Sequence, residues 1–145
     1  MTDSRTWGPF LIRVAVSLVV LVHGVGKLFA VGPAAMPVSK FAGFLAGLGL
    51  PFASPLAWAV AVVEVGGGLL LLLGLFTRIT ALVLAVEMVV ATILVHLPKG
   101  YSDSELTIVL SLAAFSLAAS GAGELSVDSI VSDGELNSSF MISET

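Results

Sequence analysis

Four long apolar segments follow one another along the chain and constrain its fold more than any other feature. They cover about residues 8–30, 56–76, 79–97 and 105–122. A helix needs about 20 mostly apolar residues to cross about 30 Å of hydrocarbon, and these segments reach or approach that length. Helix-breaking or polar residues separate them, among them Gly32-Pro33 and Pro98-Lys99-Gly100. We therefore predict an all-α membrane protein whose residues 1–125 form one bundle of four transmembrane helices.

The composition excludes a soluble alternative. Hydrophobic residues make up 57% of the chain and charged residues 11%, whereas soluble domains carry about 25% charged residues. Too few polar side chains exist to cover the surface, so the lipid bilayer must do so. The first span is expected to be retained rather than cleaved as a signal peptide, because His23 and Lys27 interrupt its apolar region.

A shorter amphipathic segment lies between the first two spans. Residues 38–48 place Phe41, Phe44, Leu45 and Leu48 on one helical face. About 11 residues cannot span a bilayer, so we predict a short interfacial or re-entrant helix, with a plain loop as the alternative. After the fourth span, residues 126–145 are polar, acidic and weakly patterned, and they are expected to form a mobile tail.

Four spans place both termini on the same side of the membrane. Arg5, Arg13 and Arg78 fall on that side, against Lys40 and Lys99 on the other. The positive-inside rule favours cytoplasmic termini by this narrow count. We expect a multi-pass protein in the plasma membrane of a prokaryote.

Several ionisable residues lie within the spans, where an unpaired charge costs several kcal/mol. With a helical rise of about 1.5 Å per residue, His23 lies about 10 Å and Lys27 about 5 Å below the outer edge of the first span. Glu64 lies about 12 Å below the same edge on the second span. His23 and Glu64 therefore match in depth, and His23 and Lys27 share a helical face.

The third and fourth spans add further groups near this level. Glu87 lies about 15 Å from the outer edge, whereas His96 and Glu105 lie at the edge itself. We predict a polar pocket in the outer half of the bundle that binds a small molecule, and we interpret His23 and Glu64 as candidates for proton relay. The candidate ligand-binding residues are His23, Lys27, Glu64, Glu87, His96 and Glu105.

The same charges could instead lock the helices together. In that interpretation Lys27 pairs with Glu64, and Arg13 pairs with Glu87, its nearest partner by depth. Buried ion pairs stabilise poorly, which favours a functional role for the His23, Lys27 and Glu64 group. Glu105 has an ordinary explanation as well, because an acidic residue in the first turn of a helix is favoured by the helix dipole.

Several functional classes are disfavoured by the sequence. The absence of cysteine excludes thiol chemistry and iron–sulfur ligation, and the absence of a basic cluster argues against nucleic-acid binding. Haem ligation by His23 and His96 is disfavoured because their depths differ by about 9 Å. His96 and Glu105 lack a third metal ligand, so we predict no metal site.

These residues lie within a pattern that resembles the DoxX family of small four-helix membrane proteins. The similarity covers about residues 10–125 and rests on five ordered patches with matching spacing. The patches are Leu21–Phe29, Gly47–Pro51, Val63–Gly68, Leu73–Arg78 and Val95–Tyr101.

The resemblance implies a role beside a quinone or a redox partner, because the family includes DoxD-type subunits of thiosulfate:quinone oxidoreductase. The leading hypothesis is a membrane subunit of a redox system that binds a quinone or a similar small molecule. His23 and Glu64 would deliver protons and Lys27 would hold negative charge. The chain ends soon after its fourth span, so a complete oxidoreductase is expected to need a partner subunit.

Two other functions are compatible with the pattern. A membrane scaffold or chaperone that recruits a partner enzyme would need the charges for helix pairing alone. A small transporter is less favoured because the sequence shows no inverted repeat. A homo-oligomer is compatible with each of these functions.

Overall fold

The computed structural model describes residues 4–132, with the side chains from Trp7 onward, and its regular structure in that range is helical. The helices are α1 (Ser4–Phe29), α2 (Val38–Gly47), α3 (Ala53–Leu73), α4 (Thr77–Ala91), the π-helical turn η1 (Thr92–His96), the 3-10 turn η2 (Leu97–Lys99) and α5 (Tyr101–Ser120). Four stretches are long and apolar enough to cross a membrane: Trp7–Phe29, Ala53–Leu73, Thr77–Lys99 and Tyr101–Ser120. The predicted all-α membrane fold with four spans is confirmed.

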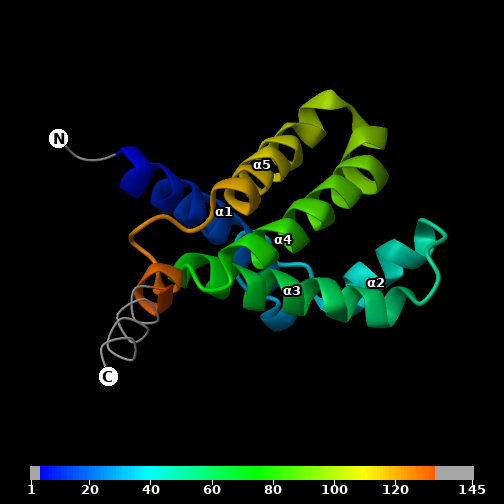
Figure 1. The fold of residues 1–145 in the computed structure, drawn as a ribbon. Helices are drawn as coiled ribbons and strands as arrows, with labels where there is room; N and C mark the ends of the chain where they lie inside the picture. The colour runs from blue at the N-terminus through cyan, green and yellow to red at the C-terminus, as the bar shows by residue number, and fades with distance from the viewer. Residues whose placement is uncertain (1–3, 133–145) are drawn as a thin grey trace, which may run out of the picture.

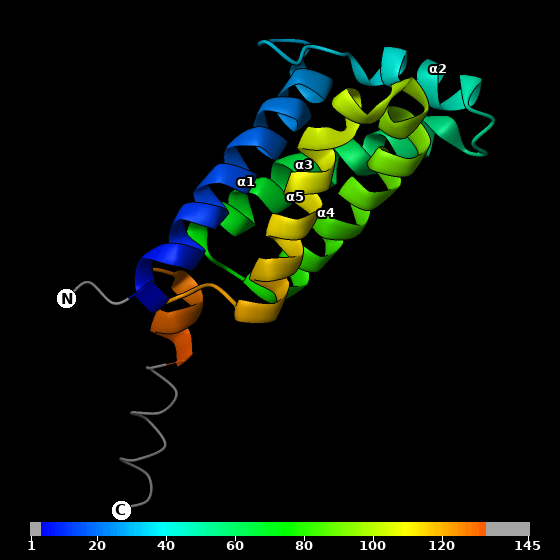
Figure 2. The same cartoon turned by 90° about the horizontal axis from the view of Figure 1, so that it is seen from above.

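The bundle consists of two helix pairs. α1 packs along α3, and α4 packs along α5, while α2 covers one end of the bundle (Figures 1 and 2). Both ends of the described chain lie at the opposite end (Figure 2). We call these two ends the α2 end and the terminal end. The main buried core joins α1, α3, α4 and α5 through side chains such as Val20, Leu71, Leu84 and Leu117.

Glycines allow α1 and α3 to approach closely. A Cβ atom on Gly24 would lie 2.7 Å from Cγ2 of Val65, and one on Gly68 would lie 2.7 Å from Cγ of Leu21. Neither separation is compatible with a larger residue, so the small side chains set the distance between the two helices. This is the packing that membrane helices use when lipid removes the hydrophobic drive for association.

The outer surface of the spans is apolar. Leu18, Ile79 and Leu112 are 56%, 69% and 65% exposed, respectively. Contiguous exposed apolar surface of this extent is rare on soluble proteins, and it matches the lipid contact that the sequence predicts.

The segment between the first two spans does form a short helix. In α2, Val38 and Leu45 are buried, and Phe41 and Phe44 are half-buried in a small cluster with α3. The helix ends at Gly47, so Leu48 follows it and is exposed. α2 therefore contributes its apolar face to one end of the bundle.

Residues 126–132, the first part of the tail that was expected to be mobile, make specific contacts with the start of α4. Asp128 accepts hydrogen bonds from the backbone N–H groups of Phe76 (2.8 Å) and Thr77 (2.9 Å), at the start of α4. The N–H of Asp128 donates to the carbonyl of Gly74 at 2.9 Å. The reason is that the first turn of α4 has unsatisfied N–H groups, which a carboxylate can cap. Residues 133–145 of the predicted tail lie outside the described residues.

Candidate functional site

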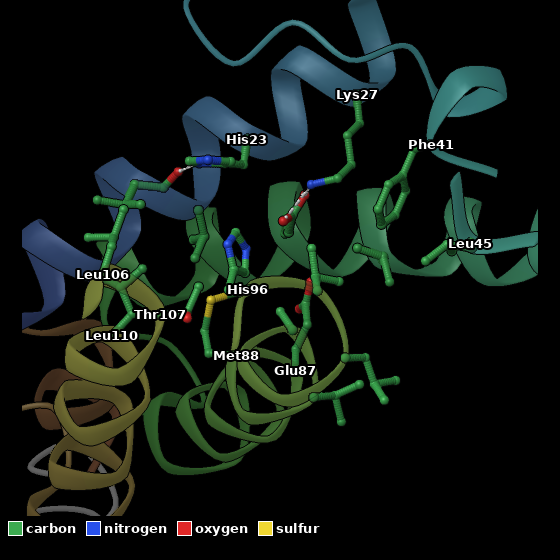
Figure 3. Close-up of a pocket in the computed structure, with 18 of the residues that line it drawn as sticks. His23, Lys27, Phe41, Leu45, Glu87, Met88, His96, Leu106, Thr107 and Leu110 are labelled. Carbon is green, nitrogen blue, oxygen red and sulfur yellow. Dashed lines mark hydrogen bonds and ion pairs between the residues drawn. The ribbon is translucent and has the colours of Figure 1, made fainter. Parts of the chain in front are cut away.

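A cavity of about 370 Å³ lies inside the α2 end of the bundle. Most of its lining is aliphatic, from α1, α3, α4, η1 and α5, and α2 contributes Phe41 and Leu45. Its ionisable lining residues come from α1, α3, α4, η1 and α5, and Figure 3 labels four of them. The ionisable residues are His23, Lys27, Glu64, Glu87, His96 and Asp103.

Lys27 and Glu64 form a buried ion pair at one wall of this cavity. The Nζ atom of Lys27 donates to both carboxylate oxygens of Glu64, at 2.7 and 2.5 Å. The two residues are 8% and 4% exposed. The close approach of α1 and α3 at Gly24 brings them together, since a Cβ on Gly24 would lie 2.9 Å from Cβ of Glu64. The predicted alternative of a Lys27–Glu64 pair is therefore realised, and Nζ also lies 5.0 Å from the ring centre of Phe41.

Glu87 is in a different situation from Glu64. Both of its carboxylate oxygens are buried, and neither has a hydrogen-bond partner. Its side chain extends from α4 toward the ion pair (Figure 3), close enough to interact electrostatically with both Glu64 and Lys27. The wall at the ion pair therefore carries the carboxyl groups of Glu64 and Glu87 and one ammonium, and the ammonium is already engaged by Glu64.

The two histidines line the same cavity from other directions. His23 is exposed, and its Nδ1 bonds to the backbone carbonyl of Val19 at 2.9 Å. A carbonyl can only accept, so Nδ1 carries the proton and Nε2 is left as an acceptor. His96 is half-buried and belongs to the π-helical turn η1. Such turns widen a helix and occur often at functional sites.

Sequence reasoning missed Asp103 and Thr107, which also line the cavity. Asp103 was placed outside the fourth span, which was expected to begin at residue 105, whereas α5 begins at Tyr101. Thr107 accepts a hydrogen bond from the Thr92 hydroxyl at 2.8 Å, which joins α5 to η1. The i, i+3, i+7 spacing of Ser104, Thr107 and Ser111 could have indicated an inward polar stripe on this helix.

The placement of Glu105 in the pocket is wrong. Glu105 is exposed and does not line the cavity. It lies two residues from both Asp103 and Thr107, and residues two apart on a helix point about 200° away from each other. Because Thr107 is buried and both of these residues line the cavity, Glu105 points away from it.

The predicted ion pair between Arg13 and Glu87 does not form. Nη2 of Arg13 donates to the carbonyl of Leu125 at 2.6 Å, at the terminal end of the bundle. The carboxylate oxygens of Glu87 have no partner. The reason is that α1 packs against α3 and α5 instead of α4. Within residues 4–132, no three His, Asp or Glu side chains are grouped in a way that could hold a metal ion.

The fold and the cavity define a membrane protein with four candidate spans and a largely apolar internal chamber that contains a few buried ionisable groups. The sequence matches the DoxX family over residues 8–97, and the chain belongs to this family. The predicted resemblance is confirmed.

Two relatives match almost the whole chain. One is "Putative oxidoreductase CatD" of Bacillus subtilis (strain 168), which is 31% identical over 144 residues, covering 94% of this chain and 96% of the relative. The other is an uncharacterized protein of Haemophilus influenzae, 31% identical over 138 residues, covering 88% of this chain and 96% of the relative. No solved structure is significantly similar to the chain.

Proposed function

We propose that the protein is a membrane subunit of a redox system and that its cavity binds a quinone or a similar apolar ring with polar oxygens. The volume of about 370 Å³ falls within the range of about 300–1,000 Å³ that small-molecule sites span. An aliphatic lining with a few polar groups fits a ligand of this kind better than it fits a sugar or a nucleotide. The printed name of the Bacillus subtilis relative, an oxidoreductase, points in the same direction.

The observation that carries the proposal is the unpartnered carboxyl group of Glu87. Leaving a buried polar group without a hydrogen bond costs about 1–3 kcal/mol, and more when it is charged. Both oxygens of Glu87 are in this state beside open space. A quinone carbonyl would accept a hydrogen bond from the Glu87 carboxylic acid, and a quinol hydroxyl would donate one to its carboxylate, so the residues present fit such a ligand.

Each polar residue then has a role that its surroundings support. Glu87, as the carboxylic acid, donates a hydrogen bond to a quinone carbonyl oxygen, and Lys27, which Glu64 holds, places its ammonium group nearby. His23 can pass a proton because Nε2 remains free while Nδ1 is fixed on Val19. Reduction of a quinone consumes two electrons and two protons. We assign the electrons to a partner oxidoreductase subunit. The two protons come from water, and we assign their transfer to His23 and Glu64, whose carboxylate accepts a proton before it passes one on.

A scaffold that recruits a partner enzyme is the second candidate. The Lys27–Glu64 pair favours it, since a salt bridge between α1 and α3 would exist in a bundle that binds no small molecule. The two candidate functions differ in the role of Glu87. A quinone site uses this residue to bind the ligand, whereas a scaffold gives it no role, because it pairs with no other helix.

The full chain, purified in detergent, distinguishes these functions. Decyl-ubiquinone should raise the melting temperature of the protein as its concentration rises, and a Glu87→Leu variant, which has no donor, should weaken that binding by about tenfold, the loss expected for one buried hydrogen bond. Glu105→Leu is the matched control, because it removes a carboxyl group outside the cavity. The quinone proposal fails if the wild-type protein shows no stabilisation, or if both variants respond to decyl-ubiquinone like the wild type. Either result would favour the scaffold that recruits a partner enzyme.

A further inference from the structure

A second hollow lies at the terminal end of the bundle, away from the cavity. It is a recess of about 480 Å³ between the start of α4 and the chain that follows α5. We call it the Arg78 recess. Figure 2 shows the segment after α5 folding back toward the α3–α4 turn at this end. It is lined by Phe76–Ile79, Ser120–Gly123, Ser126, Asp128, Ser129 and Ser132.

Two hydrogen-bond donors in the recess have no partner among the described residues. Arg78 is exposed, and its guanidinium lies alongside Gly121, where a Cβ would be 3.4 Å from Nε and 3.5 Å from Nη2. Thr77 is 1% exposed, and its hydroxyl makes no hydrogen bond. A guanidinium and a hydroxyl are donors suited to the oxygens of a phosphate group.

The other polar groups of the recess are already engaged. Both carboxylate oxygens of Asp128 accept hydrogen bonds from the first N–H groups of α4, which offset its negative charge. The hydroxyls of Ser120, Ser126 and Ser129 donate to nearby backbone carbonyls. Arg78 is therefore the group left to attract an anion here.

The apolar neighbours of Arg78 indicate what kind of anion would fit. Phe76 and Ile79 also line the recess, and they are 63% and 69% exposed. Thr77 is the first residue of a candidate span, so these side chains lie where hydrocarbon meets headgroups. A free phosphate would leave the apolar side chains unused, whereas a lipid would place its acyl chains along them.

We propose that the Arg78 recess binds the phosphate of an anionic phospholipid, with Arg78 and Thr77 as donors and with Phe76 and Ile79 against the acyl chains. This site is independent of the cavity, because it lies at the other end of the bundle and shares none of its lining residues.

Native mass spectrometry of the full chain in detergent, with added dioctanoyl-phosphatidylglycerol, tests the proposal. The wild-type protein should retain one such lipid in preference to dioctanoyl-phosphatidylcholine. Arg78→Gln should weaken retention by about fivefold, the effect of one cationic contact at a charged bilayer surface. Lys99→Gln, which removes an exposed cation near the α2 end, is the matched control and should leave retention unchanged.

Thr77→Val supplies a second variant that keeps the shape of the side chain and its backbone cap. It should weaken lipid retention while the melting temperature stays the same or rises, because the buried hydroxyl has no partner to lose. Equal retention by the wild type and Arg78→Gln would refute the site. Displacement of the lipid by inorganic phosphate at equal concentration would refute the lipid assignment.

Discussion

The two ends of the bundle both bury ionisable side chains, but only one of them places such a group beside open space. At the α2 end, Glu87 has two unpartnered oxygens and faces a cavity. At the terminal end, Arg13 is 1% exposed and also has two unpartnered nitrogens, Nε and Nη1. Its guanidinium packs directly on Gly74, where a Cβ would lie 1.8 Å from Nη1. A buried ionisable group therefore indicates a ligand site when it lines a cavity, as Glu87 does. It indicates a structural contact when it packs directly on the chain, as Arg13 does.

The largest expected effect comes from breaking the ion pair at the α2 end. Lys27→Met leaves Glu64 buried without its partner and should lower the free energy of unfolding by about 3–5 kcal/mol. Unfolding in mixed detergent and SDS micelles would measure it. The double variant Lys27→Met with Glu64→Leu is the control and should recover most of the loss. If the single variant were as stable as the wild type, the pair would not be a buried charge pair.

The next largest effect is expected at the terminal end. Gly74 ends α3 with φ +71°, and an added methyl group would collide with Arg13. Gly74→Ala should therefore cost about 2–3 kcal/mol of unfolding free energy, from backbone strain and displacement of the guanidinium. Gly43→Ala is the control, since nothing lies within 4 Å of its added Cβ. An equal change in both variants would show that Arg13 is not held against Gly74.

A change of opposite sign is expected at Glu87. Glu87→Leu removes two buried unpartnered oxygens and should raise the free energy of unfolding by about 1–2 kcal/mol. The same variant should bind decyl-ubiquinone about tenfold more weakly. A gain of stability together with weaker binding would show that Glu87 serves the ligand and not the fold. Glu64→Leu alone should instead destabilise the protein, because it leaves Lys27 buried without its partner. A destabilised Glu87→Leu protein would mean that Glu87 has a structural partner.

The smallest effect is expected at Glu105. This residue is exposed on α5, outside the cavity. Glu105→Gln should change the free energy of unfolding by less than about 0.5 kcal/mol, as surface substitutions usually do. A loss of ligand binding in this variant would place the site on the outer face of α5. The cavity at the α2 end would then not be the ligand site.

Much of the fold could be predicted from the sequence because hydrophobic length is a local property. The four spans and the short helix at residues 38–48 follow from it directly. Depth along a helix is also local, which is why His23 and Glu64 were expected at matching levels, and both line one cavity. The helix start at Tyr101 was missed because polar residues precede the apolar run, and that shift hid Asp103 and misplaced Glu105.

The partner of each charge could not be predicted, because depth does not specify which helices are neighbours. Arg13 was matched to Glu87 by level, but α1 lies against α3 and α5, and the chain after α5 supplies the carbonyl that Arg13 binds. The same segment was expected to be mobile because its composition is polar. Its order comes from unsatisfied N–H groups at the start of α4, about 50 residues earlier in the chain.

The sequence by itself determined that this chain forms four membrane-crossing helices with ionisable groups at matching depths, because both properties depend on residues close together in the chain. The tertiary structure decided which charges pair, which carboxyl group is left beside a cavity, and which loop is tied down. These outcomes depend on which helices pack together, and contacts between residues far apart in the chain fix that packing.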